Sequence, residues 1–401
     1  MRKVIAILLV LALALSITAC ASTADPTTPS SDETTQTQDT PTTQTQDTPT
    51  TKYKIGFLHT NFNDSLGHNA LRAVKKAADT LGVEVETFAY SGADDSLKAV
   101  ENFISAGVDG ILVCPASDAV LPKLADLCAA NKVWIMSCFR EVAEQGAIDL
   151  LAKNDWYLGT VHESEIDTAA VLAQILAKQG HTEVCMFTQA PGMVAVDQRL
   201  SSFKENAQKN GINILAEAYL DVSTAGNAAA SIAPGYDLFL GSYPEATGVF
   251  MPATAAGMGE AAVASLKAHN AVGKVQFVAF DSFDGMDEAF DEGLCCGLAT
   301  AHHADPFYAF MVLYNAMAGN RLTEEKVNLS LNYMVVTSAE TCKELSEYVL
   351  NDKYDLYSSE EIMKFTKEGN PELTIEDIQE EMNQYTLENV VSRIKTREGI
   401  E

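Results

Sequence analysis

Basic residues are scarce in this chain, which has 27 Lys and Arg against 55 Asp and Glu in 401 residues and a formal net charge of -28. A surface of that sign repels nucleic acid and anionic lipid headgroups, and no basic stripe interrupts it. We therefore expect a protein that binds no nucleic acid.

Motifs for catalysis and metal binding are also lacking. The sequence has no Cys-x-x-Cys pair, no nucleophile elbow, no phosphate loop and no His-Glu-x-x-His spacing. His302-His303-Ala304-Asp305, together with His162-Glu163, could supply metal ligands. Adjacent histidines in a strand point to opposite faces, however, so only one could enter a given site. We expect no metal, no cofactor and no enzymatic activity.

A long apolar run is missing as well. The only candidate is at the N-terminus, where Arg2 and Lys3 precede the apolar residues 4–15. This run is shorter than the ~20 residues that a membrane-spanning helix needs, so residues 1–19 are predicted to be a signal peptide. Ile17-Thr18-Ala19-Cys20 resembles the lipobox of bacterial lipoproteins, which implies a diacylglyceryl (palmitate) anchor on Cys20; an ordinary secretory peptide is the alternative.

Residues 20–52 are predicted to form a disordered tether behind Cys20. They are rich in Thr, Gln, Pro and Asp, and the unit Thr-Gln-Thr-Gln-Asp-Thr-Pro-Thr occurs at 35–42 and again at 43–50. Such a composition cannot offset the entropy of ordering the chain. The seven cysteines after Cys20 are an odd number, which argues against a complete disulfide framework.

From residue 53 to 336, short β-rich apolar runs alternate with helical periodicity, the pattern of parallel sheets covered by helices. Asp94 or Asp95 could cap one helix, and Asp305-Pro306 supplies a cap and an early proline for another. The stretch around 141–156 is expected to be irregular. Two α/β lobes are more plausible than one core at this length, and ligands bind where parallel strands end.

The order of motifs resembles that of the type I periplasmic binding proteins, in particular the ribose and galactose-binding branch. Gly107-Val108-Asp109-Gly110-Ile111-Leu112-Val113 is the most specific match, and Lys54-Ile55-Gly56-Phe57 and Val278-Ala279-Phe280-Asp281 are also similar. The resemblance implies two Rossmann-like lobes with parallel sheets, joined by a three-strand hinge. Its expected boundaries are 53–160 plus 303–332 for the N-terminal lobe, 161–302 for the C-terminal lobe and 333–337 for the hinge return.

The same resemblance implies a set of ligand-binding residues, although several family positions are changed. The arginines are kept but Leu66, Gly67, Phe139 and Ala253 depart from the ribose-binding pattern, so ribose is not the expected ligand. The polar candidates offer hydrogen bonds and the aromatic ones offer an apolar face for stacking. The predicted ligand-binding residues are Phe62, Asp64, Phe139, Arg140, Arg199, Phe280, Asp281 and His303.

Function follows from the anchor and the two lobes. We expect a monomeric, lipid-anchored protein on the extracytoplasmic side of the cell membrane that captures a small polar, sugar-like ligand and delivers it to an ABC permease. The alternatives are a nucleoside-binding lipoprotein of the basic membrane type and a sensing module for a membrane receptor or kinase.

Residues 338–401 extend past the usual end of this fold and contain 16 acidic and 7 basic residues. Ser358-Ser359-Glu360-Glu361 and Thr374-Ile375-Glu376-Asp377 have the spacing of helix starts. We expect an acidic helical extension that packs along one lobe, with a partner-docking surface as the alternative.

Overall fold

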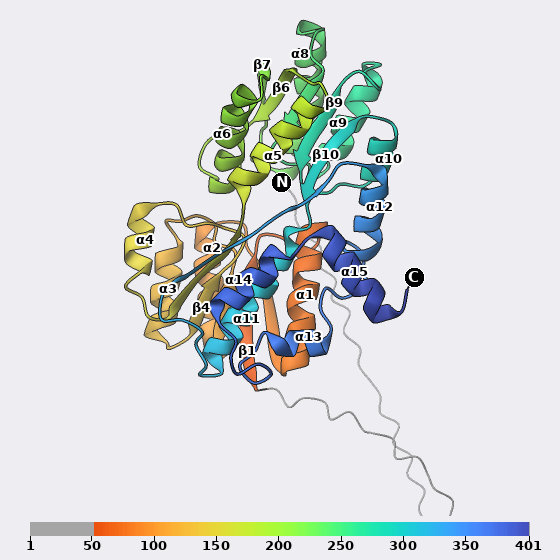
Figure 1. Ribbon diagram of the computed structural model, residues 1–401. Helices are drawn as coiled ribbons and strands as arrows, with labels where there is room; N and C mark the ends of the chain where they lie inside the picture. The colour runs from red at the N-terminus through yellow and green to blue at the C-terminus, as the bar shows by residue number, and fades with distance from the viewer. Residues whose placement is uncertain (1–51, 401) are drawn as a thin grey trace, which may run out of the picture. The chain divides into compact units, whose positions relative to one another are not determined.

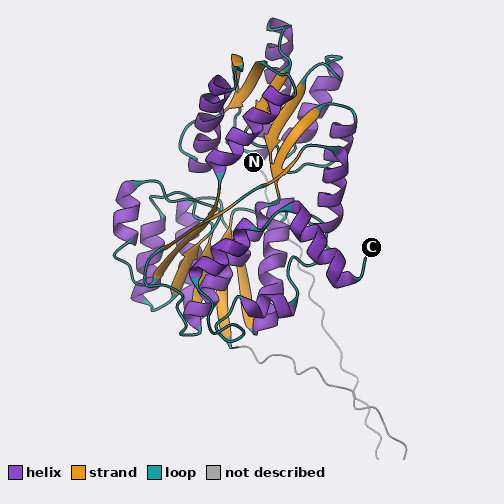
Figure 2. Cartoon of the chain, in the orientation of Figure 1, coloured by secondary structure: helices purple, strands orange, loops and turns teal. Residues whose placement is uncertain are grey.

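Two six-stranded sheets, each flanked by helices, make up most of the described chain (Figures 1 and 2). The computed structural model describes residues 52–400, so the predicted signal peptide, Cys20 and nearly all of the tether lie outside the described residues. Within that described range, no helix is both long enough and apolar enough to cross a bilayer.

The first sheet carries the N-terminal half of the chain and is parallel throughout, with the strand order β11-β5-β4-β3-β1-β2. We call this sheet and its helices the first lobe. Its strands are β1 (Tyr53–His59), β2 (Val83–Ala89), β3 (Gly110–Val113), β4 (Trp134–Ser137), β5 (Tyr157–Glu163) and β11 (Val327–Leu331). Its helices are α1 (Ser65–Leu81), α2 (Ala93–Ser105), α3 (Leu121–Ala130), α4 (Gln145–Leu151) and α11 (Asp305–Met317).

The second sheet has the order β12-β10-β9-β8-β6-β7, and only β12 runs antiparallel to its neighbour. We call this sheet and its helices the second lobe. Its strands are β6 (Glu183–Thr188), β7 (Asn213–Tyr219), β8 (Gly248–Met251), β9 (Gln276–Phe280), β10 (Cys295–Thr300) and β12 (Met334–Val336). Its helices are α5 (Glu165–Lys178), α6 (Val194–Lys209), α7 (Ala225–Ala230), α8 (Ile232–Ser242), α9 (Met258–Ala268) and α10 (Met286–Asp291).

The chain changes sheet three times: after β5, after β10 and between β11 and β12. Strand β5 stays paired with β11 as far as Glu163, three residues past the boundary expected at residue 160. After β10, a 3-10 helix, η1 (His302–Ala304), leads into α11 of the first lobe. The predicted α/β fold, with two lobes and a three-strand hinge, is confirmed.

Several local expectations are corrected by the structure. Helix α2 begins at Ala93 with Gly92 as its N-cap, so Asp94 and Asp95 lie in the first turn and do not cap it. Part of the stretch expected to be irregular forms α4, and α7 and α8 fill a region with no clear apolar periodicity. Helix α11 does begin at Asp305, but that side chain accepts a hydrogen bond from Phe139 N instead of capping the helix.

The C-terminal extension consists of α12 (Ala339–Tyr348), α13 (Ser359–Lys364), α14 (Ile375–Asn383) and α15 (Leu387–Glu398). The expected helix starts at Ser358 and Thr374 are confirmed, and each forms a capping box. The extension contacts both lobes, because α12 packs on α10 while α13 packs on α1 and α14 on β11. The expectation that it packs along one lobe is therefore wrong.

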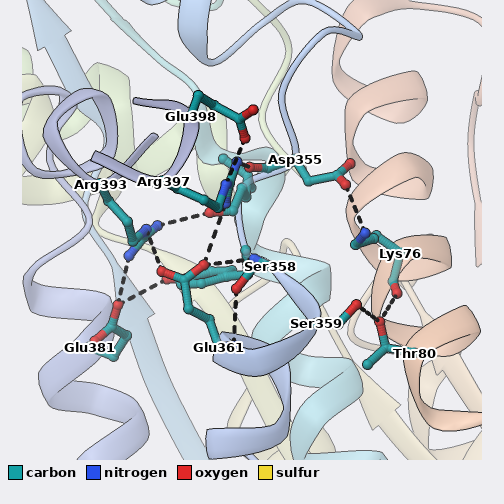
Figure 3. A network of polar contacts seen from close by, with 12 residues as sticks. Lys76, Thr80, Asp355, Ser358, Ser359, Glu361, Glu381, Arg393, Arg397 and Glu398 are labelled. Atoms are coloured by element: carbon teal, nitrogen blue, oxygen red, sulfur yellow. Dashed lines mark hydrogen bonds and ion pairs between the residues drawn. The ribbon is translucent and has the colours of Figure 1, made fainter. Parts of the chain in front are cut away.

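Polar contacts attach the extension to the first lobe (Figure 3). Lys76 Nζ on α1 lies 3.0 Å from Asp355 Oδ2, and Thr80 Oγ1 on α1 lies 3.1 Å from Ser359 Oγ on α13. The Gln379 side chain pairs with both the N–H and the carbonyl of Ser330 on the edge strand β11. This pairing covers an edge that would otherwise present unpaired backbone groups.

Gly159 lies where β5 and β11 approach most closely. Its φ is +133°, and a Cβ at this position would lie 2.1 Å from the carbonyl oxygen of Val327. Both the backbone conformation and the missing space therefore require glycine at this point of the first crossing strand.

We predict that Gly159→Ala lowers the free energy of unfolding by about 2–4 kcal/mol, because it combines backbone strain with a clash against backbone. Urea denaturation followed by circular dichroism measures this. Gly180→Ala is the matched control, since Gly180 also has a positive φ, of +87°, but has open space around it. It should cost only about 1 kcal/mol. Equal losses in the two variants would contradict the close-approach argument.

Candidate functional site

A cavity of about 470 Å³ opens at the carboxyl ends of β9 and β10. Its size falls within the ~300–1,000 Å³ of small-molecule sites, and its place is where open parallel sheets bind ligands. The start of α1, the loops after β8, β9 and β10 and the end of α12 all contribute to it. The lining residues are Asp64, Ser65, Leu66, Thr254, Ala255, Ala256, Gly257, Glu260, Asp281, Ser282, Phe283, Asp284, Gly285, Met286, Asp287, Thr300, Ala301, His302, His303, Ser346 and Leu350.

The eight predicted ligand-binding residues divide into two groups in the structure. Asp64, Asp281 and His303 line the cavity. The other five lie outside its lining, and three of these are aromatic residues in packed clusters. Phe62 packs on Phe57 and Phe139 on His59, with ring centroids 5.1 and 5.2 Å apart, and Phe280 is fully buried.

Asp64 stands at the rim of the cavity as the N-cap of α1. Its Oδ1 accepts from Gly67 N at 2.8 Å, and its Oδ2 accepts from Asn61 Nδ2 at 2.9 Å. Both carboxylate oxygens therefore have a protein partner, and the side chain fixes the direction in which α1 leaves the rim.

Arg199 is held inside the second lobe by a buried bidentate ion pair. Its Nε lies 2.6 Å from Glu165 Oε2 and its Nη2 lies 3.0 Å from Glu165 Oε1. Nη2 also donates to Tyr333 Oη at 2.7 Å, Nη1 donates to the Pro252 carbonyl at 2.9 Å, and the guanidinium lies over the Phe280 ring. Burial alone would lower the pKa of Arg199, but the Glu165 carboxylate raises it well above its usual value. The cation is thus neutralised by the protein itself.

Asp281 lies in the cavity wall, directly after the end of β9. Its carboxylate makes no hydrogen bond within the described residues, and it lies 4.0 Å from Arg199 Nη1 and 3.9 Å from His302 Nε2. It does not cap α10, whose N-cap is Gly285. Burial raises the pKa of Asp281, and Arg199 opposes that rise. The carboxylate is therefore an available acceptor.

Backbone strain gathers at the same strand ends. Phe139, Asp281 and Ala301 have φ values of +62°, +72° and +64°, although none of them is glycine. Each such residue costs about 1–3 kcal/mol and persists only where the surroundings hold it, which is common at ligand sites. In each case the residue lies just past the end of β4, β9 or β10.

Arg140 lies outside the cavity lining, beside a pair of buried carboxyl groups. The only hydrogen bond of its side chain within the described residues goes from Nη1 to the Phe139 carbonyl at 3.2 Å. Glu163 and Asp305 are buried, and each has one oxygen without a partner. Burial and the neighbouring Glu165 raise the pKa of Glu163 to about 8, while burial and Glu163 raise that of Asp305 well above its usual range. The pKa of Glu163 therefore lies above neutral pH, so this hinge carboxyl is mostly protonated at pH 7.

The two adjacent histidines occupy η1, so the strand geometry expected for them does not apply. Both side chains are buried, and both line the cavity. Burial lowers the pKa of His302 well below its usual value and that of His303 to about 3, so both rings are neutral at physiological pH. No cluster of metal-ligating side chains occurs among residues 52–400.

Glu165 and Tyr333 were not anticipated from the sequence. Glu165 follows β5 in the segment Glu163-Ser164-Glu165, where two acidic residues directly after an apolar strand could have indicated buried carboxylates. Tyr333 lies in the crossing between β11 and β12, and only the three-dimensional fold brings it to Arg199.

We predict that Glu163→Gln flattens the fall of stability with rising pH. The folded protein holds the Glu163 proton up to a pKa of about 8, whereas the unfolded chain releases it near 4.5. Between those values the folded state binds more protons, so wild-type stability decreases as pH rises through the window from about 5 to about 8. The glutamine variant, which cannot ionise, should show a shallower decrease in urea-denaturation midpoint.

Glu101→Gln is the control for this titration, because Glu101 is exposed on α2. Its midpoints should follow the wild-type curve. If Glu163→Gln followed that curve as well, Glu163 would not be titrating in the window.

Solved structures provide an independent view of the fold. An ABC transporter solute-binding protein of Actinobacillus succinogenes with bound D-allose has a TM-score of 0.63 and 15% identity, covering 73% of this chain and 99% of its own. A carbohydrate transporter solute-binding protein of Agrobacterium radiobacter in complex with D-arabinose has a TM-score of 0.61 and 17% identity, covering 75% and 99%. One of Bacillus halodurans with bound myo-inositol has a TM-score of 0.61 and 18% identity, also covering 75% and 99%.

At these identities the solved structures show similarity of fold. No curated protein matches the chain. The profile of the periplasmic binding protein domain matches residues 55–321, which is more than half of the chain. The match includes the crossings after β5 and after β10 and ends before the crossing between β11 and β12. The strand ends that form the cavity lie within this match. The chain therefore belongs to the family of periplasmic binding protein domains, and the resemblance found in its sequence is confirmed.

Proposed function

We propose that this protein is an extracytoplasmic solute-binding lipoprotein that captures a small polar, sugar-like ligand between its lobes and delivers it to an ABC importer. The observation that carries the proposal is the cavity at the ends of β9 and β10, where side-chain atoms of Asp281 and His302 have no hydrogen-bond partner among residues 52–400. Buried polar groups are costly unless a hydrogen bond satisfies them, and a ligand would supply that bond.

Support for a sugar-like ligand comes from the solved structures of similar fold. Those of Actinobacillus succinogenes, Agrobacterium radiobacter and Bacillus halodurans hold D-allose, D-arabinose and myo-inositol. All three ligands are small and rich in hydroxyl groups, so a cavity of about 470 Å³ lined by hydroxyl, carboxylate and imidazole groups suits this class. Of the eight candidate residues, Asp281 and His303 fit a direct role best, while Arg199 acts by positioning the cavity wall.

We predict that a sugar of this class stabilises the protein against heat, because a ligand that binds only the folded state adds about 2.7 kcal/mol at a concentration 100 times its Kd. Differential scanning fluorimetry against a panel of pentoses, hexoses and inositols measures this. Ala255→Trp should abolish the shift, since Ala255 is exposed on the cavity wall and an indole there would occupy the space.

The control for the blocked cavity is Ala93→Trp, because Ala93 is equally exposed but lies at the start of α2 outside the lining. It should keep the wild-type shift. A panel without any stabilising sugar, or a shift that survives in Ala255→Trp, would count against ligand capture in this cavity.

We also predict that Cys20→Ala releases the protein from the membrane. The diacylglyceryl group expected on Cys20 contributes ~0.8 kcal/mol for each buried methylene, and two chains are needed for a stable anchor. Membrane fractionation with metabolic palmitate labelling checks this. Wild-type protein should be labelled and sediment with membranes, whereas the variant should be unlabelled and soluble. A labelled Cys20→Ala variant would place the lipid elsewhere.

A further inference from the structure

The charge on the cavity wall is of one sign. Five of the lining residues are acidic and, among the lining residues in the described part of the chain, none is Lys or Arg. The two lining histidines are neutral at physiological pH because burial lowers their pKa values. The acidic lining residues are Asp64, Glu260, Asp281, Asp284 and Asp287.

The carboxylates at the rim have partners to differing degrees. Asp64 caps α1 through Oδ1 and accepts from the Asn61 side chain through Oδ2, and Glu260 Oε1 accepts from Asp284 N at 3.1 Å. Neither of these bonds removes the negative charge, because each donor is a neutral amide. The rim therefore attracts cations and repels anions before any ligand touches the interior.

The interior holds a separate feature that indicates a ligand. His302 is 95% buried, its side chain lines the cavity, and its Nε2 makes no hydrogen bond in the described structure. That nitrogen faces Asp281 Oδ1 at 3.9 Å, too far for a hydrogen bond but close enough for one donor group to reach both atoms. The Asp281 carboxylate has no hydrogen bond in the described structure, and Nε2 of the neutral His302 ring accepts when the proton is on Nδ1. In that tautomer the pair forms an acceptor site without a donor.

The nearby arginines do not donate a hydrogen bond to the Asp281 carboxylate. Arg199 Nη1 is 4.0 Å from Asp281, but the guanidinium is already paired with Glu165 and bonded to Tyr333 and Pro252. Arg140 lies outside the lining, and its Nη1 donates to the Phe139 carbonyl. Neither arginine therefore hydrogen-bonds the Asp281 carboxylate, whose oxygens stay available to a ligand.

We propose that the cavity selects a ligand that carries a protonated primary amine on a hydroxylated ring, an amino sugar by chemical class, with the ammonium group donating to Asp281 and His302. This inference rests on the proposed function and narrows its ligand. An ammonium has three donors and no acceptor, which matches a site made of acceptors. A divalent cation fits less well, because no metal-ligating cluster occurs among residues 52–400. Leu66, Phe283 and Met286 offer an apolar surface for the ring.

The test is isothermal titration calorimetry on the detergent-solubilised full chain at about pH 6.5, where a primary amine is protonated. D-glucosamine, D-galactosamine and D-mannosamine are each compared with the parent neutral sugar and with the N-acetylated form. At least one amino sugar should bind about ten-fold or more tightly than both of its neutral counterparts, the value of one charge-assisted hydrogen bond.

Asp281→Asn should abolish this preference, because it keeps the shape of the side chain and removes the charge. Asp94→Asn is the matched control: it changes the net charge of the protein equally, but Asp94 is exposed on α2 and is not among the lining residues. It should keep the wild-type preference, which separates a local carboxylate from the general acidity of the protein.

Each outcome is informative. Neutral sugars that bind as tightly as their amino forms would overturn the amine inference and leave the proposed function standing. An amine preference that survives in Asp281→Asn would overturn the role of this carboxylate. A complete lack of binding by both neutral and amino sugars would contradict the proposed sugar-binding function and, with it, this inference.

Discussion

The ion pair between Arg199 and Glu165 is the interaction on which the geometry of the ligand cavity depends. Glu165 begins α5 directly after the first crossing, Tyr333 lies in the third crossing, and Arg199 on α6 bonds both of them as well as the carbonyl of Pro252 after β8. A buried ion pair of this kind is not a large source of net stability, but the loss of one partner leaves an uncompensated charge that costs about 3–5 kcal/mol. The ion pair instead fixes positions, because it joins two crossings and a strand end at one point. The Arg199 guanidinium also packs on the Phe280 ring, and Phe280 directly precedes Asp281.

Much of the fold could be predicted from the sequence, because apolar periodicity is a local property. The strand that begins at Gly110 and the helix from Asp305 to Met317 follow directly from such patterns. Helices α7 and α8 could not be predicted in this way, since their segment Ala225–Ser242 is rich in small residues with little amphipathic contrast. The side-chain contacts of the candidate site were even harder to predict from the sequence. The family resemblance identified Asp281 and Arg199 as candidates, but only the fold shows that Arg199 is paired with Glu165 and that the Asp281 carboxylate has no hydrogen bond in the described residues.

The role of Asp305 illustrates why side-chain roles are harder to predict than elements. Asp followed by Pro at a helix start is a strong local signal for a cap, and the helix does start there. Its carboxyl group nevertheless bonds Phe139 N, 166 residues away in sequence. That bond helps to hold Phe139 in its strained conformation. Asp305, whose sequence context is typical of a helix cap, therefore joins the segments that follow β4 and β10. Tertiary contacts of this kind leave no trace in the spacing of the residues.

The C-terminal extension makes a fourth connection between the lobes, since α12 lies on α10 and α13 lies on α1. The three crossings alone would let one lobe rotate relative to the other about the hinge. The fourth connection lies away from the hinge, so it restricts this rotation as long as its contacts hold. The only part of that path without helix is the segment 349–358, between α12 and α13. Its ten residues can span at most about 35 Å when extended, so a rotation that moves the two helices further apart must break the contact of α12 with α10 or of α13 with α1.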